Sequence, residues 1–392
     1  AVFRVILVMS SALAAATSET LGPIDSTFPL PLLSGAHQPG NASLPAVGFG
    51  TWQIPRDATE RVVLEALEVG YRHFDCAFVY KNQAEIGSAF AKAFSSGTVR
   101  REDLWVTSKL GTWFHKADDV ALNLRTTLNE LRLDYVDLFL IHWPVPLRHG
   151  SAIPFQPEDF THIPLRETWA ALELAADQGL VRALGVSNFS PRKLDDLLTF
   201  ARIRPVVNQV EVHPMWRNDY LREFCSSRGI HVSAYAPLGS PGRPLRHVEE
   251  QVDTAAVLHH PTVTEIAAET SRTSAQVVLT WAIQHGMSVV PKATSRSHMM
   301  DNLGALSGSR LSLQQMHRLD QLSQVRSAAS PLTSIFSALP EYTADSAQAQ
   351  ALPGKMFTTD HGPYHPDGPY RSIDDIWEAE WRPNAETQHN EL

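Results

Sequence analysis

The chain has 392 residues, of which 43% are hydrophobic, and a formal net charge of -9 at pH 7 with a pI of about 6.0. This length can bury one large core, so we expect a single folded domain once tails are set aside. The net charge is negative and the sequence contains no block of Lys or Arg, so we expect neither nucleic acid nor an anionic membrane as a partner.

The cysteines and histidines give no pattern for a disulfide or a metal site. Cys76 and Cys225 lie in apolar stretches and are predicted to be small buried side chains. No Cys-x-x-Cys or His-Glu-x-x-His spacing occurs, and His259 and His260 precede a proline in an expected loop. We therefore predict no metal ion.

The two ends of the sequence resemble targeting signals. Residues 1–16 place one arginine before an apolar run and an alanine-rich end, as in a cleaved secretory signal peptide; a frayed apolar leader and a mitochondrial presequence remain alternatives. The last four residues, HNEL, resemble an endoplasmic-reticulum retrieval signal but depart from HDEL at Asn390. With a glycosylation sequon at Asn41, these features predict the endoplasmic-reticulum lumen, and otherwise the cytoplasm. A second sequon at Asn188 is expected to be buried.

Apolar strand-like runs alternate with helix-like segments from residue 44 onward. The expected strands end near residues 52, 75, 109, 142, 186, 210, 235 and 290. Helices are expected at residues 58–69, 83–93, 118–131, 166–178, 191–201, 219–228, near 297 and at 313–323. Long loops are expected at residues 144–164 and 236–261; the first either covers the rim or is a tolerated insertion.

Eight strand and helix units predict an α/β fold, a single (β/α)8 TIM barrel at residues 44–325 with long rim loops. A probable signal peptide (1–16) and an N-terminal segment (17–43) would precede it. An irregular C-terminal tail (326–392) would follow it.

Three expected strands end on titratable residues, namely Asp75, Lys109 and His142, and Tyr80 follows the first of them. The carboxyl ends of parallel barrel strands share one rim, so we expect these side chains to meet there. Taken alone, Asp75 could equally be a turn residue or a helix cap.

The strings around these residues resemble the aldo-keto reductase family. They are GYRHFDCA, VTSK and DLFLIHWP, joined in order by GVSNF and APLGSPGRP, and the resemblance runs from about residue 44 to 302. It implies a monomeric, NAD(P)H-dependent reductase of small carbonyl compounds, in which Asp75, Tyr80, Lys109 and His142 are the catalytic residues.

The chemistry of carbonyl reduction suits these four side chains. Reduction places charge on an oxygen that must be stabilised and protonated. A phenol can donate that proton, and we expect Lys109 to lower the pKa of Tyr80 while Asp75 keeps Lys109 charged. Neutral His142 would hydrogen-bond the carbonyl oxygen.

A cofactor must supply the hydride, and no G-x-G-x-x-G follows the first strand, so a Rossmann site is not indicated. The resemblance implies that the nicotinamide half is bound by Ser187, Asn188, Gln209, Tyr235, Leu238 and Ser240. Read without the resemblance, Ser187 and Asn188 would cap a helix and Tyr235 would be a core aromatic.

The resemblance places the phosphate end of the cofactor at residues 289–302. Lys292, Ser295 and His298 match positions near the 2'-phosphate, and Asn302 matches an adenine contact. Two residues depart from the family pattern: Ala293 replaces a serine and His298 replaces an arginine, although Arg296 could substitute. We therefore expect NADP(H), with NAD(H) possible.

Two further departures concern cofactor exchange and the substrate. The ion pair that pins a strap over the pyrophosphate in several members falls here on Gln53 and Gly242, which predicts faster cofactor exchange. Trp52 and Trp143 would line the substrate site with Tyr80 and His142, and Gly111 would leave room where many relatives carry tryptophan.

Three tail aromatics, Tyr370, Trp377 and Trp381, either line the substrate site or merely anchor the tail. The leading expectation is reduction of aldehydes or ketones with NADPH. An NAD-linked alcohol or sugar dehydrogenase and a non-catalytic cofactor-sensing protein remain alternatives.

Overall fold

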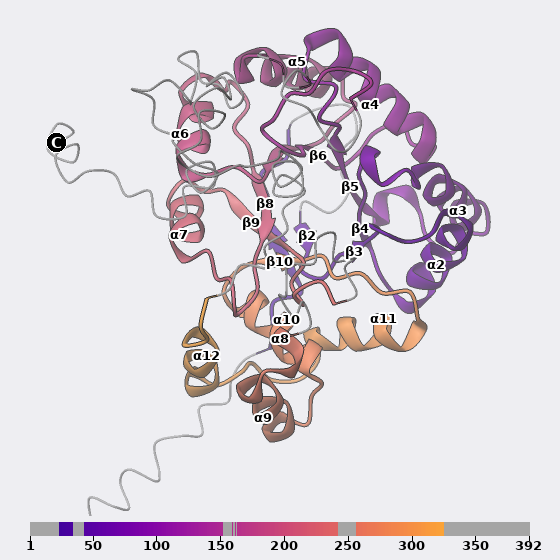
Figure 1. Ribbon diagram of the computed structural model, residues 1–392. Coiled ribbons are helices and arrows are strands. Elements are labelled where there is room, and N and C mark those ends of the chain that lie inside the picture. Colours follow the sequence, from indigo (N-terminus) through magenta and orange to yellow (C-terminus); the bar gives the residue numbers. More distant parts are fainter. Residues whose placement is uncertain are drawn as a thin grey trace, which may run out of the picture.

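The computed structural model describes residues 23–33, 43–151, 159, 161, 163–241 and 256–324 (Figure 1). Several predicted features lie outside these residues: the signal-like residues 1–16, the sequon at Asn41, Gly242, the tail aromatics Tyr370, Trp377 and Trp381, and the final HNEL.

Eight parallel strands form one sheet in chain order, each paired with the next. They are β3 (Phe49–Gly50), β4 (His73–Asp75), β5 (Trp105–Leu110), β6 (Leu138–Ile141), β7 (Leu184–Ser187), β8 (Val207–Glu211), β9 (His231–Tyr235) and β10 (Ser288–Val289). A parallel bridge between Val47 and Val289 joins the two edges, and the Gly50 N–H donates to the Pro291 carbonyl at 3.0 Å. The sheet closes on itself, which confirms the predicted barrel.

Helices surround the sheet and cover its outer face (Figure 1). The first six lie at α2 (Arg56–Val69), α3 (Gln83–Ser95), α4 (Ala117–Leu131), α5 (Leu165–Asp177), α6 (Pro191–Phe200) and α7 (Asp219–Ser227). After β10 come α11 (Arg296–Leu303) and α12 (Leu313–Asp320). These agree with the expected helices to within a few residues at each end.

Three helices between β9 and β10 were not predicted: α8 (Ala256–His259), α9 (Pro261–Thr270) and α10 (Ser274–Gln284). The expected loop at residues 236–261 therefore ends earlier. In α10, Val277 to Ile283 are all buried, so the apolar residues show no one-sided period. A start signal was present, because Thr273 and Gln276 form a capping box before this apolar run.

A two-stranded antiparallel hairpin, β1 (Thr27–Pro29) and β2 (Ser43–Pro45), was also missed in the N-terminal segment. The Phe28 ring packs 4.8 Å from the ring of His231, the first residue of β9. Leu30 and Leu44 join a buried cluster with Trp105 and Leu138, which lie at the starts of β5 and β6. The hairpin thus closes the amino-terminal end of the barrel and leaves the carboxyl ends of the strands for the site.

Candidate active site

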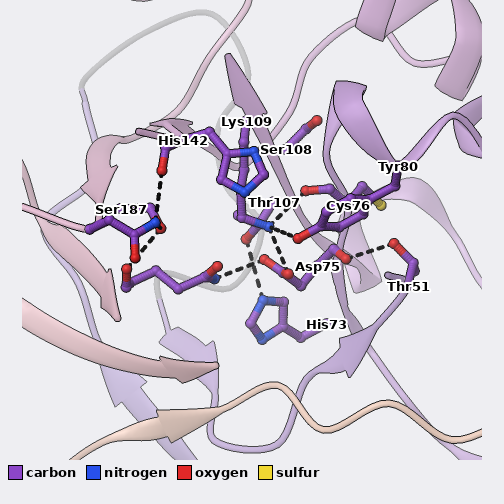
Figure 2. A network of polar contacts seen from close by, with 12 residues as sticks. Thr51, His73, Asp75, Cys76, Tyr80, Thr107, Ser108, Lys109, His142 and Ser187 are labelled. Carbon is purple, nitrogen blue, oxygen red and sulfur yellow. Dashed lines mark hydrogen bonds and ion pairs between the residues drawn. The ribbon is translucent and has the colours of Figure 1, made fainter. Parts of the chain in front are cut away.

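Lys109 lies in β5 with none of its surface exposed, and its ammonium group donates three hydrogen bonds (Figure 2). Nζ lies 2.7 Å from Asp75 Oδ2, 2.9 Å from the Cys76 carbonyl oxygen and 3.3 Å from Tyr80 Oη. An ammonium carries three N–H donors, so this set satisfies all of them.

Asp75 is the last residue of β4 and is 3% exposed. One carboxylate oxygen accepts from Lys109, and the other accepts from Gln209 Nε2 at 2.8 Å. The N-cap position of α3 is Asn82, so Asp75 is not a helix cap. A buried carboxylate paired on both oxygens is the arrangement that offsets the cost of removing its charge from water.

Tyr80 ends a short 3-10 helix (Phe78–Tyr80) that connects β4 to α3, and the next residue, Lys81, has a left-handed φ of 60°. Burial, reinforced by the negative charge of Asp75, raises the pKa of the Tyr80 phenol well above its usual value. The pKa is therefore raised and not lowered as expected, so the expectation is wrong as a net effect. The charge of Lys109 is balanced by Asp75 at 2.7 Å, so burial of the phenol prevails.

His142 follows β6 and is 8% exposed, with its ring 5.8 Å from the Tyr80 ring in an edge-on arrangement. Burial, followed by the charge of Lys109, holds the pKa of His142 well below its usual value, as a neutral imidazole requires. Its Nδ1 is buried without a hydrogen-bond partner among the described residues. Because an unpaired buried N–H is costly, Nε2 is the better place for the ring proton.

The residues predicted to hold the nicotinamide form one network that reaches Asp75. Asn188 Nδ2 donates to the His142 carbonyl oxygen at 3.0 Å, and its Oδ1 accepts from Tyr235 Oη at 2.9 Å. Ser187 Oγ donates to the Gln209 carbonyl oxygen at 2.8 Å. Gln209 then donates its side-chain N–H to Asp75, so the network extends from His142 to Asp75.

The alternative interpretations of these residues do not hold. Helix α6 is capped by Ser190, whose Oγ accepts from the Lys193 N–H, so Ser187 and Asn188 are not its cap. Tyr235 is partly exposed at the end of β9, unlike a core aromatic. Asn188 is 5% exposed, as expected for a sequon inside the fold.

Leu238 and Ser240 lie in the loop after β9 and are both partly buried. Leu238 packs against the main core, and Ser240 has a left-handed φ of 57°. The described part of this loop ends at residue 241, so these two residues mark the start of the expected strap.

The residues predicted for the phosphate end gather around the start of α11. Lys292, Ser295 and His298 are exposed, and Ser295 is the N-cap, with Oγ accepting from the His298 N–H at 3.4 Å. Arg296 is also exposed, and its Nη1 lies 3.3 Å from Glu68 Oε2 on α2. Asn302 differs from the rest, since it is 3% exposed and hydrogen-bonds the Tyr71 side chain.

The predicted substrate walls differ in exposure: Trp52 is 38% exposed, whereas Trp143 is 7% exposed. The room expected at Gly111 is already filled. A Cβ at Gly111 would meet Phe114 Cδ2 and Phe78 Cδ1, each at 3.1 Å, and the two rings pack edge-on at 5.1 Å. Both phenylalanines were missed, although each lies in a connection after a strand that ends at the candidate site, where barrel enzymes carry site residues.

The described part of the loop after β6 lies over this rim. The Leu147 N–H donates to the Thr112 carbonyl at 2.8 Å, and Trp113 Nε1 donates to the Ser151 carbonyl at 3.2 Å. The loop therefore contacts the residues that follow Lys109, which favours a role at the site over a tolerated insertion.

Within the described residues, no group of three or more His, Cys, Asp or Glu side chains could hold a metal ion. The same part of the chain contains no helix of the length and apolarity needed to cross a membrane. Cys76 and Cys225 are both buried and unpaired, and burial raises the pKa of each thiol to about 12.

Comparisons with known proteins agree with this geometry. The model of the aldo/keto reductase family matches residues 46–324, more than half of the chain. Aldo-keto reductase family 4 member C11 of Arabidopsis thaliana is 38% identical over 341 residues, covering 86% of this chain and 96% of that protein. Deoxymugineic acid synthase 1 of Hordeum vulgare is 39% identical over 343 residues, with 86% and 97% covered.

A solved structure, the aldose reductase of Schistosoma japonicum, superposes with a TM-score of 0.68 at 37% identity and covers 78% of this chain and 96% of that one. Sequence, fold and relatives therefore agree. The chain belongs to the aldo/keto reductase family and is an NAD(P)H-dependent oxidoreductase of small carbonyl compounds.

Proposed function

We propose that this protein reduces aldehydes or ketones to alcohols with NADPH, using Tyr80 as the proton donor. The observation that carries the proposal is the threefold contact of the buried Lys109 ammonium with Asp75, Cys76 and Tyr80. A lysine held in this way places a positive charge 3.3 Å from a phenol oxygen at the rim.

Each side chain has a distinct task in this proposal. NADPH, when bound, supplies the hydride that no side chain can provide. The Nε2–H of neutral His142 and the O–H of Tyr80 donate hydrogen bonds to the substrate oxygen as its negative charge grows. Tyr80 then gives up its proton, and Lys109 stabilises the phenolate that remains.

The raised pKa of Tyr80 is compatible with this task. An alkoxide is a much stronger base than a phenolate, so the phenol still transfers its proton at the end of reduction. A high pKa also keeps Tyr80 protonated before each turnover. The cost is a weaker acid, which the neighbouring Lys109 charge partly offsets.

The structure offers a direct test of fit for a nicotinamide amide. A carboxylate can only accept hydrogen bonds, so the Asp75 contact fixes Gln209 with its Nε2 toward Asp75. Gln209 Oε1 then remains as an acceptor for an amide N–H. At the other end, exposed Lys292 and Ser295 stand at a helix N-terminus, which suits a phosphate.

Absorbance of the reduced cofactor in the near ultraviolet tests the proposal. The purified protein should consume NADPH with a panel of aldoses, aliphatic and aromatic aldehydes and ketones, because relatives of similar identity are named for different substrates. Faster turnover with NADH, or of alcohols with NAD, would favour the dehydrogenase alternative. Cofactor binding without turnover of any substrate would favour the sensing alternative.

A further inference from the structure

An ion pair that no predicted role explains lies beside the phosphate end of the site. Arg296, the first residue of α11, has Nη1 3.3 Å from Oε2 of Glu68 in the last turn of α2. The two side chains are 50% and 63% exposed. Nearby, buried Tyr71 donates its O–H to the Met299 carbonyl at 3.1 Å, so packing fixes the spacing of the two helices.

The pair matters for phosphate binding because Arg296 is itself suited to bind a phosphate. Arginine is permanently charged and suits bidentate recognition of a phosphate or a carboxylate. His298 occupies the position where the family pattern has an arginine, so Arg296 is the guanidinium available on this turn. Glu68 offers that guanidinium a competing carboxylate.

We infer that Glu68 is a specificity residue: it competes with the 2'-phosphate of NADP(H) for Arg296 and so narrows the preference for NADP(H) over NAD(H). The inference rests on the proposed binding of NADP(H) at Lys292 and Ser295. An added phosphate must displace the Glu68 carboxylate from Arg296 or bind beside its negative charge. A cofactor with a free 2'-hydroxyl meets neither obstacle.

Isothermal titration calorimetry with adenosine 2',5'-bisphosphate and with 5'-AMP tests this without any turnover. Glu68→Gln should tighten the bisphosphate about two- to fivefold at low salt and leave 5'-AMP unchanged, the range expected for exposed charge pairs. The gain should shrink in 0.5 M salt, because exposed charges are screened. In an Arg296→Gln background, Glu68→Gln should have no such effect.

Glu60→Gln is the matched control, because Glu60 lies about two turns earlier on α2 and pairs with Lys92 of α3. An equal gain in Glu60→Gln would overturn the inference, since net charge alone would explain it. The inference would also be overturned if the gain persisted in the Arg296→Gln background. It would likewise be overturned if Glu68→Gln gave no gain although the wild-type protein binds the bisphosphate more tightly than 5'-AMP. If the wild-type protein does not prefer the bisphosphate, the proposed 2'-phosphate site fails, and the role of Glu68 fails with it.

Discussion

The charged residues around Tyr80 and those at the proposed phosphate end differ in how far they are exposed to water. Lys109 is fully buried, and each of its N–H donors has a protein acceptor. Arg296 is half exposed, and its one ion pair with a described residue is to the exposed carboxylate of Glu68. Charges interact strongly in the low dielectric of the barrel interior, and weakly in water. Under the proposed function, the chemistry therefore depends on the buried core, whereas the cofactor preference can be changed at little structural cost.

The largest effect should come from Tyr80→Phe, which removes the proposed proton donor and little else. Loss of general acid catalysis lowers turnover by about 10²- to 10⁴-fold. Cofactor affinity, measured by quenching of tryptophan fluorescence, should change little, because the hydroxyl acts on the substrate oxygen. Near wild-type reduction by this variant would remove Tyr80 from the mechanism.

Lys109→Met should test how strongly the interior depends on its ion pair. It leaves Asp75 buried without its cation, so the free energy of unfolding in urea should fall by about 3 to 5 kcal/mol. Asp75→Asn in the same chain should recover most of that stability, since a neutral amide can still accept from Gln209, yet turnover should stay low.

Arg296→Met is the exposed counterpart and should change the free energy of unfolding by less than about 1 kcal/mol. If the two single variants lost similar stability, the contrast between the two regions would be wrong.

The sequence was most informative where strands deliver polar side chains to the rim. Asp75, Lys109 and His142 were placed correctly because an apolar run that ends on a titratable residue fixes both the strand and its functional end. The predicted direction of the Tyr80 pKa shift was wrong, because the shift depends on burial and on a balancing charge that only the folded geometry shows. The space at Gly111 was misjudged for the same reason, since Phe78 and Phe114 come from separate loops.

The missed elements were those without a local period. Helix α10 is buried on all sides from Val277 to Ile283. The β1 and β2 hairpin consists of two three-residue strands that are stable only against the end of the barrel. Tertiary packing decides whether such segments form a helix or a strand. The fold class itself depended on the long alternation of strands and helices, which local patterns do show.

Acid should destabilise the barrel through its buried histidines, which include His142. Burial lowers the pKa of His73, His115 and His231 from 6.5 to about 4 in each case. Below about pH 6.5 these histidines are protonated in the unfolded chain, whereas in the folded chain they stay neutral until about pH 4. Their contribution to the free energy of unfolding should therefore be fully present above pH 6.5. It should fall by about 1.4 kcal/mol per pH unit for each histidine as the pH is lowered from 6.5 to 4.

Urea unfolding at intervals between pH 7 and pH 4.5 measures this slope. His115→Gln should flatten the slope by about 1.4 kcal/mol per pH unit, the share of one histidine. An unchanged slope in His115→Gln would mean that this histidine is protonated in the folded protein.

Lys292→Met should weaken NADPH much more than NADH. A charge-assisted contact to a phosphate is worth about 1.5 to 3 kcal/mol, which corresponds to roughly 10- to 100-fold in Kd. Fluorescence titrations with both cofactors give the ratio directly. Equal losses for the two would show that the 2'-phosphate is not bound at Lys292, and the proposed phosphate end would have to move.

The smallest effect should come from His298→Arg, which restores the guanidinium that the family pattern has at this position. The new side chain would stand one turn from the N-cap Ser295 of α11, at an exposed position. NADPH should bind about two- to fivefold more tightly and NADH should not change, because only the 2'-phosphate gains a cation. The gain should decline in 0.5 M salt, as an exposed contact requires. If His298→Arg changes nothing while Arg296→Gln weakens NADPH, then Arg296 already binds the phosphate despite its contact with Glu68, and the exposed end is more firmly organised than its accessibility suggests.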